Sequence, residues 1–336
     1  MSGKAALLLR RTALRLKDLE YRVTAFFVLG ALRLARRFDP DRALDFADRA
    51  ARRIGPWVRS RHRLAIDNIS RAMPEKSEAE VAAIVSDMWG SMGRLVVEYV
   101  FLDKLFEHDF DGEEGGRIEV IGKDRFIAVR DSDRPAILFT AHTGNFEMLA
   151  VAASAFGMKM SALFRPPNNP YVARELLSLR HMSMGDMVAS RAGAAFSLAR
   201  ILDRGGRIGV LVDQKFRRGI RNAFFGLPCE SSPLVPRLTK QYEPDLYPCR
   251  SIRLPGNRYR LELQEKVELP RGADGDVDVE ATAQLLNDVV EGWIREHPGQ
   301  WMWFHKRWTL SGKRRTRRWK ARRGAVAKSV TTRRVS

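Results

Sequence analysis

Short β-rich segments alternate with helix-like segments between residues 117 and 212, and this alternation constrains the fold more than any other feature of the chain. The β-rich segments lie at 117–122, 136–141, 158–164, 186–190 and 207–212. The helix-like segments between them lie at 123–130, 145–156, 171–182 and 193–204. Apolar strands separated by helices predict an α/β fold, with a mainly parallel sheet that helices flank on both faces.

Further helices and strands are expected on either side of this region. Residues 41–108 form a helical lead-in, in which Ser77 and Glu80 have the spacing of a capping box. A loop is expected at 213–232, and the elements after it are a helix at 233–241, strands at 245–254 and 258–268, and a helix at 277–296. One large domain over residues 38–310, with its α/β core at 117–308, accounts for this order.

The positive charge of the chain is concentrated at its two ends. The formal net charge is +19. Residues 1–37 contain nine Lys/Arg and two acidic residues, and residues 311–336 contain eleven Lys/Arg and no acidic residue, so the residues between are nearly neutral. Basic ends indicate contact with an anionic surface, either lipid head groups or nucleic acid. The tail at 311–336 is expected to be disordered.

The N-terminal segment favours a membrane as that surface. An apolar stretch from Val23 to Leu32 is flanked by arginines, and it is shorter than the roughly 20 residues that cross a bilayer. Upstream of it, leucines alternate with basic residues, as in a basic amphipathic helix. We therefore expect residues 1–37 to be a helical, membrane-associating anchor. A buried terminal helix with a solvated basic face is the alternative.

A histidine follows the strand expected at 136–141, in the stretch LFTAHTGNFEMLA. His142 would then lie at the carboxyl edge of the sheet, where functional groups of open α/β sheets gather. After a short turn, Asn145 is a candidate N-cap, and Glu147 falls in the first turn of the next helix. A carboxylate bonded to one imidazole nitrogen fixes the tautomer and leaves the other nitrogen as a general base. A surface histidine beside a glutamate favoured by the helix dipole is the alternative.

Six motifs occur in a specific order between about Leu19 and Trp308. They are AIDNISRAMPEKSEAEV, HTGNFE, FRPPNNP, GGRIGVLVDQ, FFGLP and QWMWFHKRW. HTGNFE is similar to the H-x4-D/E signature of the glycerolipid and lysophospholipid acyltransferase superfamily. As an ordered set, the motifs resemble those of the late acyltransferases of lipid A biosynthesis, the lauroyl- and myristoyl-type enzymes of Gram-negative bacteria.

The resemblance implies a reaction and a set of catalytic residues. A hydroxyl of a lipid A precursor would attack an acyl thioester held by acyl carrier protein, and transfer would be direct, through a tetrahedral intermediate. His142 matches the catalytic base of the family and Glu147 its partner carboxylate. Arg165 follows the strand at 158–164 and matches an active-site arginine. Its fixed charge suits a phosphate or a developing oxyanion.

Substrate-binding residues are expected near this centre. Asn145 belongs to the HTGNFE motif. Asp213 and Gln214 match the DQ element, where they shape the acceptor site or organise Arg165 and nearby loops; loop-capping hydrogen bonds are the alternative. Phe225, in the stretch FFGLP, either lines the acyl path or packs in the core. The stretch QWMWFHKRW is expected to combine packing with a basic rim made by His305, Lys306 and Arg307.

No metal or cofactor is expected. The other histidines and the two cysteines lack metal-ligand spacing, and the sequence contains neither a Walker A motif nor a dinucleotide fingerprint. The implied location is the cytoplasmic face of the inner membrane. Two other readings stay open: an acyltransferase for another glycolipid or for a lysophospholipid, and a nucleic-acid-binding protein, which the basic stretch KRRTRRWKARR suggests.

Overall fold

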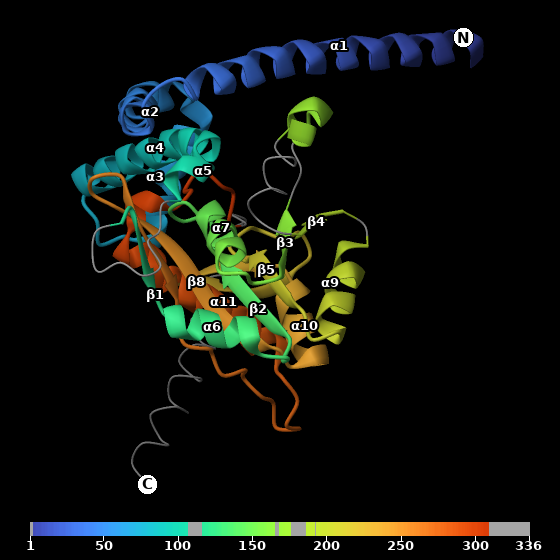
Figure 1. The fold of residues 1–336 in the computed structure, drawn as a ribbon, viewed down its shortest axis with the longest axis vertical. Coiled ribbons are helices and arrows are strands. Elements are labelled where there is room, and N and C mark those ends of the chain that lie inside the picture. The colour runs from blue at the N-terminus through green and yellow to red at the C-terminus, as the bar shows by residue number, and fades with distance from the viewer. Residues whose placement is uncertain (1–2, 107–115, 165–167, 176–185, 192, 309–336) are drawn as a thin grey trace.

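The computed structural model describes residues 3–106, 116–164, 168–175, 186–191 and 193–308. A seven-stranded sheet runs through the body of the molecule (Figure 1). Its order is β1 (Ile118–Ile121), β9 (Arg258–Leu263), β8 (Asp245–Leu254), β2 (Ala136–Thr140), β5 (Arg207–Leu211), β3 (Met160–Phe164) and β4 (Asp186–Ala189). Neighbouring strands are parallel except for the antiparallel pair β8 and β9. The prediction of an α/β fold with a mainly parallel sheet is confirmed.

Helices cover both faces of this sheet. Successive residues of a strand point to opposite sides, so an apolar strand has side chains to bury on both faces. Ile137 and Phe139 of β2 belong to one core cluster, and Ala136 and Leu138 belong to the other. The first cluster contains residues of α3 (Arg59–Ala72), α4 (Glu78–Val100), α9 (Ala194–Asp203), α10 (Leu234–Tyr242) and α11 (Val279–Glu296). The second contains residues of α5 (Leu102–Leu105), α6 (Lys123–Asp131) and α7 (Glu147–Ala155). All of β2 is therefore buried, which explains its continuous apolar sequence.

The segment predicted as a loop at 213–232 contains a β-hairpin instead. Its strands are β6 (Ile220–Phe224) and β7 (Leu227–Ser231), which pair antiparallel. The two turn residues, Phe225 and Gly226, have φ values of 53° and 68°, as the tight turns that match strand twist require. The prediction was wrong because Phe-Gly lacks the Asn or Asp that usually announces such a turn.

The helical lead-in packs against one end of the sheet. The capping box is confirmed: Ser77 N donates to Glu80 Oε2 at 2.9 Å, and Glu80 N donates to Ser77 Oγ at 3.3 Å. Helix α2 (Pro40–Ile54) lies close to α4, and the 3-10 helix η1 (Gly55–Trp57) follows it. A Cβ on Gly93 of α4 would lie 2.3 Å from the carbonyl oxygen of Ala47. Glycine therefore permits the close approach of α2 and α4.

Helix α1 (Gly3–Ala35) reaches beyond the rest of the molecule at its N-terminal end (Figure 1). Several of its apolar side chains expose more than half of their surface: Leu14, Leu16, Leu19, Phe26 and Phe27. Among the described residues, no helix combines the length and the apolar character needed to cross a bilayer. The helical N-terminus is thus observed, its membrane association remains a prediction, and the tail at 311–336 lies outside the described residues.

Candidate active site

The carboxyl ends of three central strands meet at one edge of the sheet. Strand β2 is parallel to both β5 and β8, and Val212 N donates to Thr140 O at 3.0 Å just beyond the paired strands. His142 lies two residues after β2, and Asp213 lies two residues after β5. The side chain of His142 is 13% exposed and that of Asp213 is 3% exposed. Adjacent parallel strands thus bring together two residues that are far apart in sequence.

Asp213 binds His142 through both carboxylate oxygens. His142 Nδ1 lies 2.8 Å from Asp213 Oδ1, and the backbone N–H of His142 donates to Oδ2 at 3.0 Å. Oδ2 also accepts a hydrogen bond of 2.8 Å from the indole Nε1 of Trp301. The carboxylate is therefore held by three donors, and it fixes both the backbone and the ring of the histidine.

The electrostatics of this pair favour the ionised aspartate and the protonated imidazole. Burial alone would raise the pKa of Asp213, but the charge of His142 and hydrogen bonds from His142 and Trp301 hold it well below its ordinary value. Burial alone would lower the pKa of His142, but the charge and hydrogen bond of Asp213, together with the charge of Glu147, raise it. Because ionised Asp213 only accepts, the neutral ring carries its proton on Nδ1 and a lone pair on Nε2.

Gln214 donates a hydrogen bond to that lone pair. Its amide Nε2 lies 3.1 Å from His142 Nε2, so the amide donates and the imidazole accepts. The sequence placed Asp213 and Gln214 in a substrate site or a loop cap, whereas the structure puts one on each nitrogen of His142. The neighbouring residues of the DQ element therefore define the protonation and the access of the imidazole.

Glu147 and Asn145 lie at the start of α7, beside the histidine. Glu147 is the first residue of this helix, and its N–H donates to Asn145 Oδ1 at 3.2 Å. Asn145 is fully buried and its side-chain oxygen accepts this hydrogen bond. The N-cap position, however, is occupied by Phe146, which makes no side-chain cap bond, so the prediction of Asn145 as the N-cap was wrong. The carboxylate that hydrogen-bonds to the imidazole is Asp213, while Glu147 acts on the pKa of His142 through its charge. The role of Glu147 as the orienting partner stays a prediction.

The stretch QWMWFHKRW closes over the turn that follows His142. Gly144 N donates to Gln300 O at 3.0 Å, and Thr143 forms a β-bridge with Trp301. Gly144 has a φ of 54°, and a Cβ there would lie 2.0 Å from Ser251 O, so only glycine fits this turn. The aromatic stretch was expected to pack, but the indole N–H of Trp301 also bonds to Asp213. Spacing gives no signal for that contact.

The expected basic rim of this stretch is only partly right. Lys306 is exposed, but Arg307 is fully buried and donates to Ser231 Oγ at 2.7 Å and to Asn287 Oδ1 at 2.9 Å. Burial lowers the pKa of its guanidinium. Arg307 is therefore a buried residue whose two Nη atoms donate inside the protein, while its Nε has no hydrogen-bond partner among the described residues, and it is not part of a rim. The ring of His305 lies 5.9 Å from that of His142.

Phe225 and Arg165 complete the set of predicted residues. Phe225 is buried, with its ring 5.7 Å from that of Trp303 and 5.0 Å from that of Phe224. This places it in the aromatic core, and substrate contact by Phe225 stays a prediction. Arg165 lies outside the described residues.

Comparison with known proteins gives the family. A family model described as bacterial lipid A biosynthesis acyltransferase matches residues 12–309. The chain is 26% identical over 290 residues to lipid A biosynthesis acyltransferase 2 of Shigella flexneri, covering 84% of this chain and 88% of that protein. It is also 26% identical over 265 residues to lipid A biosynthesis myristoyltransferase of Escherichia coli strain K12, covering 77% and 78%. The chain therefore belongs to the bacterial lipid A biosynthesis acyltransferase family.

Proposed function

We propose that this protein transfers a fatty acyl chain from an acyl carrier protein thioester to a hydroxyl of a lipid A precursor. Membership of the family supports acyl transfer in lipid A biosynthesis. The observation that carries the chemistry is the imidazole of His142, with Nδ1 on Asp213 and Nε2 within reach of a polar group. Such an imidazole has the geometry of a general base.

The proton moves first to His142. The acceptor hydroxyl takes the place of the Gln214 amide at Nε2, and its proton passes to the imidazole as its oxygen attacks the thioester carbonyl. Ionised Asp213, 2.8 Å from Nδ1, stabilises the imidazolium that forms. The base is therefore strengthened at the moment when it accepts the proton.

Collapse of the tetrahedral intermediate completes the transfer. The carbon–sulfur bond breaks as the carbonyl reforms, an ester to the acceptor oxygen remains, and the imidazolium returns its proton to the leaving thiolate. Glu147 adds negative charge near the imidazolium. Arg165 is proposed to stabilise the oxyanion, in line with the resemblance of its motif.

The setting proposed for this reaction is the cytoplasmic face of the inner membrane. The basic N-terminal segment and the exposed apolar side chains of α1 suit an interface between head groups and acyl chains. Acyl carrier protein is typically acidic, so basic surface of this chain offers charge complementarity for that partner.

Acyl transfer from acyl carrier protein thioesters to a labelled, underacylated lipid A precursor tests the proposal. Wild type and His142→Ala would be compared in detergent micelles, with a lysophospholipid as competing acceptor. We expect transfer to the lipid A precursor by wild type and its loss in folded His142→Ala. Transfer only to the lysophospholipid would assign a different acceptor, and undiminished transfer by His142→Ala would refute the role of the base.

A further inference from the structure

A polar cavity lies near the turn that joins β8 to β9. Its volume is about 480 Å³, within the range of roughly 300–1,000 Å³ that is typical of small-molecule sites. Helices α2 and α4, the β8–β9 turn and the 3-10 helix η2 (Pro298–Gln300) form its walls. Its lining does not include His142, Asp213 or Gln214.

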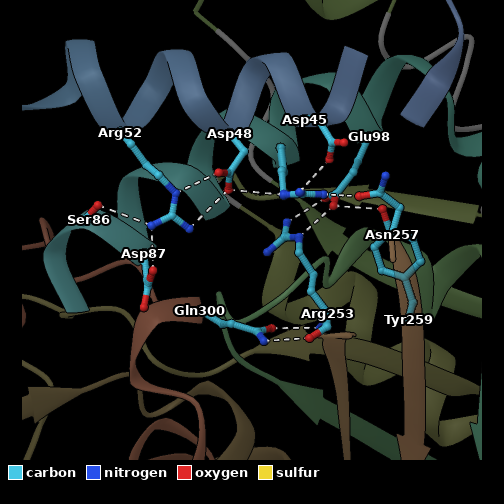
Figure 2. A network of polar contacts seen from close by, with 11 residues as sticks. Asp45, Asp48, Arg52, Ser86, Asp87, Glu98, Arg253, Asn257, Tyr259 and Gln300 are labelled. Atoms are coloured by element: carbon cyan, nitrogen blue, oxygen red, sulfur yellow. Dashed lines mark hydrogen bonds and ion pairs between the residues drawn. The ribbon is translucent and has the colours of Figure 1, made fainter. Parts of the chain in front are cut away.

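Most of the charged side chains on the wall of this cavity are paired with an oppositely charged neighbour. Arg52 binds Asp48 at 2.7 Å and Asp87 at 2.6 Å, and Arg253 binds Glu98 through two contacts of 2.6 Å. The wall therefore presents carboxylate acceptors and guanidinium donors side by side, with little net charge (Figure 2). A free oxyanion would face Asp48 and Asp87 as well as the arginines. A hydroxyl group suits both, because it donates to a carboxylate and accepts from a guanidinium.

One buried donor on this wall points to a ligand. Within the described part of the chain, Arg253 Nη1 has no hydrogen-bond partner, although the side chain of Arg253 is only 9% exposed. In Figure 2 this nitrogen points away from Glu98, toward the space beside Arg52 and Gln300. A buried donor left unpaired costs free energy, because it has lost its hydrogen bonds to water without gaining others. A ligand oxygen at this position would remove that cost.

Gln300 connects the cavity to the turn that follows His142, which we call the catalytic turn. The side-chain amide of Gln300 binds both the backbone N–H and the carbonyl of Arg253 at 2.9 Å. The backbone carbonyl of Gln300 accepts from Gly144 N at 3.0 Å. Gly144 is two residues from His142, so their Cα atoms are at most about 7.6 Å apart. A ligand against Gln300 would therefore lie next to the turn that carries the base.

We propose that this cavity binds a hydroxyl-rich sugar ring of the acceptor, with Arg253 Nη1 donating to one ring hydroxyl and Asp87 accepting from another. This inference rests on the proposed function, and it assigns the cavity the task of holding the acceptor while a different hydroxyl reaches His142. Its residues are positioning and binding groups, not catalytic residues.

Two variants test the cavity without removing a buried ion-pair partner. Asp87→Asn weakens an acceptor on the wall, and Ser91→Leu fills space on the α4 side of the cavity. The matched control is Asp131→Asn, because Asp131 has the same side-chain exposure of 57% as Asp87 and a similar arginine contact of 2.7 Å far from the cavity. We expect both cavity variants to raise the acceptor KM at least fivefold. The KM for the acyl donor should stay within twofold, and Asp131→Asn should match wild type.

A binding measurement separates this inference from the proposed function. Binding to the full chain would be measured by ¹H saturation-transfer NMR for N-acetylglucosamine as probe and by ³¹P line broadening for inorganic phosphate as comparator. Sugar binding that Ser91→Leu abolishes and His142→Ala preserves would support the cavity as a sugar site, even if wild type transferred no acyl chain and the proposed function failed. Normal acyl transfer with an unchanged acceptor KM in both variants would overturn the inference. Phosphate binding lost in the variants, without sugar binding, would overturn it in favour of an oxyanion site.

Discussion

Replacing Asp213 by asparagine should disable the base while leaving the fold in place. Oδ2 of Asp213 accepts from two donors, the backbone N–H of His142 and the indole of Trp301. In Asp213→Asn, an NH₂ group in place of Oδ2 would face these two N–H donors, so the amide oxygen must occupy the Oδ2 position. The NH₂ group then faces His142 Nδ1, which must accept, and the proton moves to Nε2. The lone pair that takes the hydroxyl proton is lost.

The expected cost follows from the value of general-base catalysis. Proton transfer by a positioned base contributes about 10²–10⁴-fold, which corresponds to roughly 3–5.5 kcal/mol of activation free energy. We expect Asp213→Asn to lower the single-turnover rate of acyl transfer by that factor. The groups around the new amide stay paired, and a flip of the Gln214 amide lets its oxygen accept from the new Nε2–H, so the thermal unfolding temperature should change little.

Two measurements check this reasoning. Single-turnover transfer from an acyl carrier protein thioester gives the rate, and ¹⁵N NMR of the imidazole reports which nitrogen of His142 carries the proton. Asp245→Asn is the control, because Asp245 is also a partly buried carboxylate, 15% exposed, but starts β8 at the opposite edge of the sheet. A rate for Asp213→Asn within tenfold of wild type, or an unchanged tautomer, would refute the assignment.

Three further predictions concern pH, the catalytic turn and the membrane. Because the pKa of His142 is raised in the folded state, its stabilising effect is full below its ordinary value of about 6.5 and is lost as pH rises through the folded pKa. The stability difference between wild type and His142→Ala should follow this course in urea titrations, and a difference independent of pH would contradict the shift. Gly144→Ala should destabilise the fold more than Gly275→Ala. Both glycines have a positive φ, which costs an alanine roughly 1–2 kcal/mol. Only at Gly144 would the new Cβ also meet backbone, at 2.0 Å, because nothing lies within 4 Å of a Cβ at Gly275. Equal melting temperatures would show that the turn can relax. Deleting residues 1–37 should release the protein from anionic vesicles, and unchanged sedimentation with vesicles would rule out the anchor.

The position of β2 could be predicted well because this strand is an almost continuous apolar run. Its burial on both faces leaves Thr140 as its one polar residue. The β6–β7 hairpin could not be predicted, since Phe225 adopts a backbone conformation that seldom suits a bulky aromatic residue. Tertiary contacts supply what the local sequence lacks there: Phe225 N donates to the carboxylate of Glu291 at 2.6 Å.

Prediction of the site was limited by sequence distance. Glu147, the predicted partner of His142, lies five positions away in the same motif, whereas Asp213, which hydrogen-bonds to the imidazole, lies 71 positions away. The sequence did contain a signal for Asp213. His142 and Asp213 each follow a predicted strand by a residue or two, and the carboxyl ends of parallel strands share one edge of the sheet. For Trp301 no such signal exists, because its indole reaches Asp213 from a segment without regular pairing in the sheet.

Synthesis from the N-terminus delays the appearance of the segment that contains Gln300 and Trp301 and closes over the turn after His142. Strand β8, the direct neighbour of β2, and the residues Gln300 and Trp301 leave the ribosome long after His142 and Asp213. Domains form from the N-terminus as the chain emerges, at about 5–20 residues per second, and long-range pairing of this kind slows folding. The nascent chain thus carries its histidine and aspartate for many seconds without the indole that holds the carboxylate. In the proposed mechanism, the base therefore gains its full support only after Trp301 has been synthesised, and a chain ended prematurely before Trp301 would lack that support.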